Sequence, residues 1–303
     1  MPRTSVSAAP GGPQTGGPQP GEPQAGTGRQ LQQLIVTICA LHARGDHQSL
    51  AVAELIKLLA TLDVDEAAAR SALSRLKKRG VLLPARKGAN AAYRLDPQLE
   101  DVFEEGDERI FAPRRAKPGD RWLLAAFSVP ESQRNLRHQL RRVLAGRGFG
   151  TVAAGLWIAP EFVHAHLRRE LEREGLLEFV EFFAADLLDD EIARRVAQWW
   201  DLEALAALYA GFTAGFEPVL ERWGADGEGG GGGASAGDDE ARAFADDVLL
   251  LTAWRRLPYL DPGLPVEFLP EDWQGIAAQR LFTTLHARLA GPAARHAARV
   301  LGS

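Results

Sequence analysis

Cysteine is almost absent from this sequence, in which Cys39 is the single thiol among 303 residues. One thiol excludes both an intramolecular disulfide and a cysteine-rich metal site. Cys39 stands near Leu34, Ile35 and Ile38 at helical spacing. We therefore expect it to be buried on the apolar face of a helix.

Long apolar runs are also missing. No window offers the ~18 uninterrupted apolar residues that a membrane-spanning helix needs. The first residues lack the basic-then-apolar order of a secretory signal. These two absences lead us to expect no membrane partner and a cytoplasmic location.

Common catalytic motifs are absent too, including those of serine hydrolases, dinucleotide-binding folds and P-loops. The glycine run between Gly224 and Gly237 has no Lys-Ser or Lys-Thr pair after it. His164 and His166 are two positions apart, so they point to different faces of a helix, and no third ligand is evident. We expect no catalytic residue, no metal and no cofactor.

Negative charge dominates the chain, whose formal net charge is -5, but its distribution is uneven. From Arg29 to Leu95 there are 11 Lys or Arg against 5 Asp or Glu. Within this stretch, "EAAARSALSRLKKRGVLLPARKGANAAYRL" carries eight basic residues and one acid. A basic segment on an acidic body indicates that one end of the protein meets a polyanion.

The pattern at the N-terminal end predicts a winged helix-turn-helix domain over residues 29–98. Residues 1–28 are dominated by Gly, Pro, Gln and Thr and are expected to be a disordered tail. Helical apolar spacing then recurs in three segments, the third of which ends at Gly80, and two short strands with a basic turn follow. Three helices and a hairpin in about 65 residues are typical of a winged helix.

The third helix and the hairpin supply the candidate DNA-binding residues. If Ala69, Ala72, Leu73 and Leu76 face the core, the opposite face is polar and basic and suits the major groove of double-stranded DNA. The start of the helix would then read bases, while its end and the hairpin tip would contact phosphates. The candidates are Glu66, Arg70, Ser71, Ser74, Arg75, Lys77, Lys78, Arg79, Arg86 and Lys87. The alternative is a charged helix face that is merely solvated.

The pattern of apolar residues changes near residue 118. Residues 118–189 alternate as strand, helix, two strands, helix and strand, an order that predicts a ferredoxin-like βαββαβ domain. A small sheet with one open face often packs against a copy of itself, so we assign this domain to dimerisation. Residues 190–303 are expected to form an all-helical domain with a flexible Gly-rich loop at 224–240. The predicted fold class is α+β multidomain.

Three blocks of the sequence stand out together. They are "AAARSALSRLKKRGVL" with "AYRL", then "WLLAAFSVPESQRNLRHQLRRVLAGRGFG" with "GLWIAP", and finally "RRLPYLDPGLPVEFLPEDWQG". In this order, the three blocks resemble the PaaX family of bacterial transcriptional repressors. The resemblance covers the chain from about residue 30 to 290. It implies the same three domains and repression of a phenylacetic acid catabolic operon, relieved by phenylacetyl-CoA. The disordered tail and the Gly-rich loop depart from the family pattern.

An aryl-CoA effector needs cations for its phosphates and apolar walls for its aryl group. Two clusters are candidates. The first comprises Arg134, Arg137, His138, Arg141 and the neighbouring Arg142 on one helix, and the second comprises Arg255, Arg256, Tyr259 and Asp261 in "WRRLPYLDPGLP". Trp199, Trp200 and Trp254 would be the walls. The alternatives are an exposed helix for the first cluster and a structural corner with core tryptophans for the second.

The leading hypothesis is a homodimeric repressor that binds an operator and releases it when an aryl-CoA binds. An enzyme that acts on nucleic acid or on a CoA thioester is the rival class. CRISPR-associated ferredoxin-like nucleases carry a metal-binding Asp late in their first strand. Here that strand, "WLLAAFSVP", has no carboxylate until Glu131. A third alternative is an architectural DNA-binding protein without a ligand.

Overall fold

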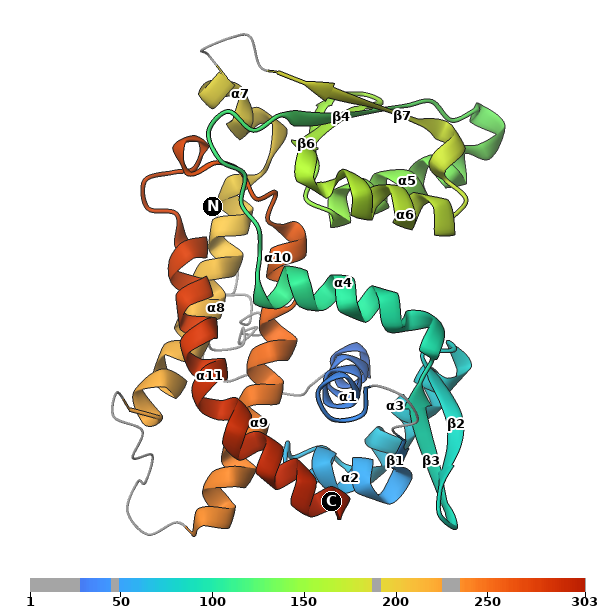
Figure 1. Cartoon of the computed structure of the whole chain (residues 1–303), viewed down its shortest axis with the longest axis vertical. Helices are drawn as coiled ribbons and strands as arrows, with labels where there is room; N and C mark the ends of the chain where they lie inside the picture. Colours follow the sequence, from blue (N-terminus) through green and yellow to red (C-terminus); the bar gives the residue numbers. More distant parts are fainter. Residues whose placement is uncertain (1–27, 45–48, 187–191, 225–234, 303) are drawn as a thin grey trace, which may run out of the picture.

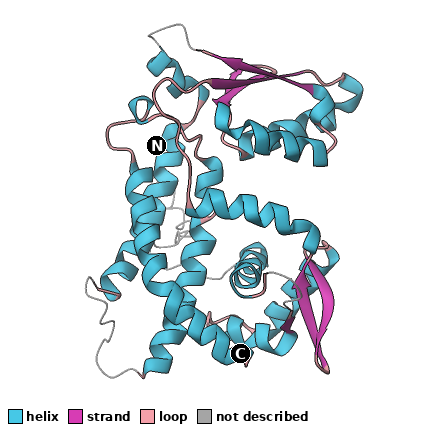
Figure 2. Cartoon of the chain, viewed as in Figure 1, coloured by secondary structure: helices cyan, strands magenta, loops and turns pink. Residues whose placement is uncertain are grey.

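The computed structural model describes residues 28–44, 49–186, 192–224 and 235–302. We refer to residues 28–99 as the N-terminal part, 122–186 as the middle part and 192–302 as the C-terminal part. Figure 2 shows strands in two places, one in the N-terminal part and one in the middle part, with helices in all three parts. None of the helices in these ranges is long and apolar enough to cross a membrane. The predicted tail of residues 1–28 lies almost wholly outside the described ranges.

The N-terminal part places helices around a small antiparallel sheet with strand order β1-β3-β2. Its elements are α1 Gly28–His42, β1 Leu50–Ala51, α2 Val52–Ala60, α3 Glu66–Lys78, β2 Leu82–Lys87 and β3 Asn90–Leu95. Asp65 caps α3 by accepting a hydrogen bond from the Ala67 backbone nitrogen at 2.9 Å. Gly80, with φ +73°, follows the end of this helix. Gly88, with φ +60°, permits the tight turn between β2 and β3.

Apolar residues at helical spacing form the core of this part. Ala69, Ala72, Leu73 and Leu76 are buried, as the periodicity of α3 predicts. Cys39 is 2% exposed, and burial raises the pKa of its thiol to about 12. The expectation of a buried thiol is confirmed.

One helix between the N-terminal and middle parts was not predicted. The short turn η1 Pro97–Leu99 leads into α4 Glu100–Phe111. In Figure 1, α4 runs from the β2-β3 hairpin toward the C-terminal helices, between α1 and the middle part. The linker of residues 112–121 then continues to the first strand of the middle sheet.

The middle part is a four-stranded antiparallel sheet with order β5-β6-β4-β7 and helices on one face. Its strands and helices are β4 Trp122–Phe127, α5 Arg134–Gly146, β5 Gly150–Ala153, β6 Leu156–Pro160, α6 His164–Arg173 and β7 Val180–Ala185, joined by the short turns η2 Glu131–Gln133, η3 Glu161–Val163 and η4 Leu177–Phe179. Apolar side chains from α5 and α6, such as Leu140 and Leu167, pack against Leu123 and Ala159 of the sheet. Trp122 and Ile158 instead join the core of the C-terminal part. The middle sheet is therefore attached to the helices that follow it.

The C-terminal part is helical, as the sequence predicts. Its elements are α7 Ile192–Trp199, α8 Leu202–Arg222, α9 Ala236–Trp254, α10 Leu257–Leu260, η5 Val266–Phe268 and α11 Gln274–Leu301. The predicted Gly-rich loop of 224–240 is shorter at its C-terminal end, because α9 begins at Ala236. Ser235 caps that helix by accepting from the Asp238 backbone nitrogen, and the Asp238 carboxylate accepts from the Ser235 backbone nitrogen. Residues 225–234 of the loop lie outside the described residues.

The N-terminal part is not an independent module, because α9 and α11 complete its core. Phe244 and Val248 of α9 and Ala293 and Ala297 of α11 are buried in the same apolar cluster as α1, α2 and α3. The buried Thr252 hydroxyl also donates to Thr37 of α1 at 2.9 Å. Two segments more than 140 residues apart thus share one core, which the local charge pattern could not reveal.

Candidate nucleic-acid interface and interdomain cavity

The outward face of α3 is polar and basic over its whole length. All eight candidates from Glu66 to Arg79 are exposed. Arg70 pairs with Glu66 at 2.7 Å, Arg75 donates to Ser71 at 2.7 Å, and Arg79 donates to Gln32 of α1 at 2.9 Å. An exposed ion pair such as Arg70–Glu66 contributes about 0–1 kcal/mol, and the other two contacts are exposed hydrogen bonds to neutral side chains. The guanidinium groups can therefore exchange these partners for those of a ligand at little cost.

The two candidate residues of the hairpin, Arg86 and Lys87, have different surroundings. Arg86 is exposed near the tip. The Lys87 ammonium instead pairs with Glu54 of α2 at 2.9 Å and donates to the Leu301 carbonyl, at the end of α11, at 3.1 Å. Lys87 therefore joins the hairpin to the C-terminal part, a role that the local basic pattern did not indicate.

The residues predicted to hold an effector do not converge. Arg134, His138 and Arg141 are exposed on α5. Arg137 turns back to the Val129 carbonyl at 2.8 Å and to Glu131 at 3.1 Å.

The second predicted cluster divides as well. Arg256 is exposed, whereas burial lowers the pKa of Arg255 and raises that of Tyr259. Of the three tryptophans considered as walls, Trp254 lines a cavity. Trp200 instead packs against Gly150 and donates to the Gly148 carbonyl at 2.8 Å.

That cavity, of about 330 Å³, lies where α4, the linker, the middle part and the C-terminal part meet. Its walls combine aromatic rings and guanidinium groups. They comprise Glu105, Glu108, Arg109, Ala112, Pro113, Arg114, Arg115, Arg147, Phe162, Val163, His166, Tyr209, Trp254, Pro258, Asp261, Gly263, Gly275 and Gln279. Of the two clusters predicted for an effector, only Asp261 is among these lining residues.

Arg109 of α4 is held mainly by backbone carbonyls. Its Nε donates to the Pro258 carbonyl at 2.9 Å, and its Nη2 donates to the Arg147 carbonyl at 3.2 Å. Burial, and then the charge of Arg147, lower the Arg109 pKa to about 10. The Tyr259 ring lies 5.0 Å from the Arg109 guanidinium carbon and 5.5 Å from that of Arg147. Tyr259 thus supports two arginines of the cavity without lining it.

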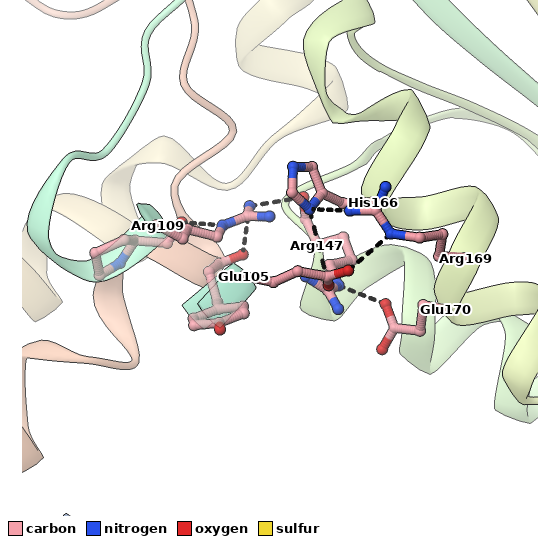
Figure 3. Close-up of polar contacts among 8 residues, drawn as sticks. Glu105, Arg109, Arg147, His166, Arg169 and Glu170 are labelled. Carbon is pink, nitrogen blue, oxygen red and sulfur yellow. Dashed lines mark hydrogen bonds and ion pairs between the residues drawn. The ribbon is translucent and has the colours of Figure 1, made fainter. Parts of the chain in front are cut away.

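Carboxylates neutralise some of the other cations. Arg147 pairs with Glu170, and Glu105 pairs with Arg169 at 2.9 Å. Figure 3 shows these groups together, with Glu105 and Arg109 coming from α4 and Arg169 and Glu170 from α6. The His166 Nδ1 lies 3.1 Å from the Arg169 Nη2. Polar contacts therefore join α4 to the middle part.

Asp261 fastens the linker to the C-terminal part. Its carboxylate accepts from Arg115 at 3.1 Å and from the Tyr209 hydroxyl at 2.9 Å, and also from the Gly263 backbone nitrogen at 2.7 Å. Burial and the Asp261 charge raise the pKa of Tyr209. Gly263 has φ +65°, and a Cβ there would lie 2.7 Å from the Arg114 carbonyl oxygen. Glycine is therefore needed for this close approach.

Sequence reasoning missed Arg109, Arg114, Arg115 and Arg147, because they lie outside its three blocks or at a block's end. The signal available was "RIFAPRR", three arginines in a segment between two expected domains. Binding sites occur preferentially at domain interfaces, so such a segment merits attention. Among the described residues, no group of three or more His, Cys, Asp or Glu side chains is arranged to hold a metal ion.

Comparison with known proteins gives a consistent result along the chain. Three models match in order, "PaaX-like protein" over residues 30–99, "PaaX protein central Cas2-like domain" over 115–197 and "PaaX-like protein C-terminal domain" over 200–299. Transcriptional repressor PaaX of Escherichia coli (strain K12) is 28% identical over 247 residues, which span 79% of this chain and 74% of that protein.

A solved structure extends the likeness to the fold. Uncharacterized protein Rv0674 from Mycobacterium tuberculosis is similar with a TM-score of 0.57 and 22% sequence identity. The match covers 88% of this chain and 98% of that one. The likeness in fold therefore extends over most of this chain rather than over one domain.

Proposed function

Because this chain belongs to the PaaX family, we propose that it is a transcriptional repressor of a phenylacetic acid catabolic operon, released by an aryl-CoA such as phenylacetyl-CoA. The repressor role follows the name of the Escherichia coli relative and the order of the three matching models. That name favours regulation over catalysis, so we propose a protein that is not an enzyme. The effector follows the family resemblance of the sequence.

The observation that carries the DNA-binding role is the exposed polar and basic face of α3. The arrangement of α1, α2 and α3 beside a β1-β3-β2 sheet supports a winged helix-turn-helix. In this proposal α3 is the recognition helix, in the major groove of double-stranded DNA, and the β2-β3 hairpin is the wing. Because phosphate contacts supply affinity and base contacts supply sequence preference, the two elements have separable roles.

The middle part is proposed as a ferredoxin-like dimerisation domain. Its strand order β5-β6-β4-β7, with α5 and α6 on one face, supports the ferredoxin-like assignment. On the edge strand β7, the Phe183 side chain is 55% exposed. An exposed edge strand with a large apolar side chain is suited to pairing with a second copy. A homodimer would place two reading helices on a palindromic operator.

The proposal is tested by footprinting on an operator selected from a random-sequence pool by the protein itself. We expect protection of a two-fold symmetric site that is lost on adding phenylacetyl-CoA and retained with acetyl-CoA or free CoA. Protection that persists with every thioester would overturn the effector part of the proposal. The absence of any sequence preference would overturn the repressor part.

The hairpin gives a prediction in which adjacent residues serve as test and control. Arg86→Ala is expected to weaken operator and scrambled DNA alike and to reduce the salt dependence of binding by about one phosphate contact. Lys87→Ala should leave that salt dependence unchanged, because its ammonium is engaged by Glu54 and Leu301. Titrations at several salt concentrations measure both slopes. The placement of these side chains would be contradicted if the salt dependence fell for Lys87→Ala and stayed at the wild-type value for Arg86→Ala.

A further inference from the structure

The cavity between α4, the linker, the middle part and the C-terminal part contains a cation whose hydrogen-bond donors are not all used. Arg109 forms no ion pair with a carboxylate among the described residues, and its hydrogen bonds there use Nε and Nη2 only. Its Nη1 donors are therefore available. Arg114, which is exposed and whose guanidinium carbon lies 5.0 Å from the Phe162 ring centre, also lines the cavity. Guanidinium groups that retain unused donors favour an oxygen acceptor or an anion as a ligand.

The acidic groups nearby do not cancel this preference. Asp261 is engaged by Arg115 and Tyr209, while Glu105 is engaged by Arg169. Glu108 is an exposed carboxylate in the same lining. The Glu108 carboxylate repels a ligand that carries negative charge along its whole length. The anionic groups of a ligand therefore lie best near Arg114, and its uncharged end lies best deeper in the cavity.

The remaining lining suits an aromatic group. Phe162, Tyr209 and Trp254 contribute rings, and Val163 and Pro258 contribute aliphatic surface. A volume of about 330 Å³ is near the lower end for small-molecule sites. It accommodates an aryl-acyl group but not an entire CoA, whose nucleotide would stay outside.

We propose that this cavity holds the aryl-acyl end of the effector thioester, with Arg109 donating to an acyl or pantetheine oxygen and Arg114 facing its phosphates. This inference rests on the proposed function and assigns it a location. Because α4, α6 and the α9-α10 segment all contribute walls, a ligand here contacts α4, the middle part and the C-terminal part at once. Its binding energy can therefore bias their relative positions.

The helix α4 connects this cavity to the DNA-reading part. One set of its side chains, Glu105, Glu108 and Arg109, lines the cavity. Another set, Glu100 and Asp107, pairs with Arg44, just beyond the end of α1. A shift of α4 on ligand binding is thereby passed to α1, which packs against the reading helix α3. We assign α4 as the element that transmits release.

Isothermal titration of phenylacetyl-CoA into the whole protein tests the location. Arg109→Met and Arg114→Ala are each expected to weaken binding about tenfold or more, because each removes charge-assisted hydrogen bonds. Arg134→Ala, an exposed arginine of α5 outside the cavity, is the matched control and should bind as the wild type does. Free phenylacetate and free CoA, titrated separately, show which half of the ligand is recognised. Equal affinity in all three variants would overturn the location.

The outcomes separate this inference from the proposed function. If the wild type binds no thioester, the effector part of the proposed function fails. If the wild type binds and both cavity variants bind equally well, only the cavity assignment fails. Thermal melting checks folding, and Arg114→Ala keeps the test valid should Arg109→Met unfold, because Arg114 is exposed.

Transmission through α4 has its own readout. In a Glu100→Gln, Asp107→Asn double variant, thioester affinity in the absence of DNA should stay at the wild-type value. The thioester concentration needed to release the operator should rise severalfold, because the ion pairs with Arg44 are lost. Release at the wild-type concentration would overturn the role of α4.

Discussion

Replacing Arg70 with alanine is expected to weaken binding to the selected operator by roughly 5- to 150-fold, or about 1–3 kcal/mol. Arg70 is exposed on the outward face of α3, and its only recorded partner among the described residues is Glu66, one helical turn earlier. An arginine in this position can form two hydrogen bonds with a guanine edge in the major groove. The loss should therefore be larger on the operator than on scrambled DNA, as measured by fluorescence anisotropy.

The chain supplies a matched control for this variant. Arg242 of α9 is also an exposed helical arginine, paired with Asp239 in the preceding turn at 3.5 Å. Arg242→Ala removes the same charge and a similar ion pair but leaves α3 intact, so operator affinity should barely change. Equal losses in the two variants would mean that Arg70 contributes only net charge. An unchanged affinity for Arg70→Ala would remove it from the interface.

Asp261→Ala is expected to lower the free energy of unfolding by about 3–5 kcal/mol. The carboxylate is 8% exposed and accepts hydrogen bonds from Arg115, Tyr209 and Gly263. Alanine would leave the Arg115 charge and the Tyr209 hydroxyl without their acceptor inside the protein, and unsatisfied buried groups are costly. Urea denaturation followed by tryptophan fluorescence measures the change, because Trp254 lies close to the same cavity.

Two less disruptive variants show how much each partner of Asp261 contributes to this loss of stability. Tyr209→Phe removes a single neutral donor and should cost about 1 kcal/mol. Asp261→Asn keeps an acceptor but removes the charge that faces Arg115, so its cost should fall between those of the other two variants. If Asp261→Ala were no more costly than Tyr209→Phe, Asp261 would not be the fastening point between the linker and the C-terminal part.

Local periodicity accounts for what the sequence predicted well. The spacing of Ala69, Ala72, Leu73 and Leu76 is sufficient to assign the buried face of α3, because a helix repeats every 3.6 residues. The alternation of strands and helices in the middle part was predicted for the same reason. Such patterns are contained within ten to twenty neighbouring residues and need no knowledge of the rest of the fold.

The cavity could not be predicted in this way, because its residues are brought together by tertiary structure alone. Arg115 and its partner Asp261 are 146 positions apart, and Arg109 and Pro258 are 149 apart. Neither arginine belongs to a periodic pattern. The predicted clusters on α5 and around Arg255 were dense in charge, but density along the chain does not indicate a shared cavity.

Lys87 shows the same limit in a single residue. Its basic neighbourhood is real, since Arg86 beside it is exposed. The partner that redirects its side chain, the carbonyl of Leu301, is 214 positions away. The sequence pattern therefore identified the hairpin as basic without showing which of its cations is occupied.

Because the N-terminal part shares its core with α11, that core cannot be completed until the end of the chain has been synthesised. Ala293 and Ala297 close the cluster formed by α1, α2 and α3, but they leave the ribosome about 200 residues later. At typical elongation rates, roughly 10–40 s pass before they arrive. Throughout that interval the nascent N-terminal part has an open apolar flank. A truncated product that stops before α11 would expose the same flank, which makes it a natural target for chaperones and proteases.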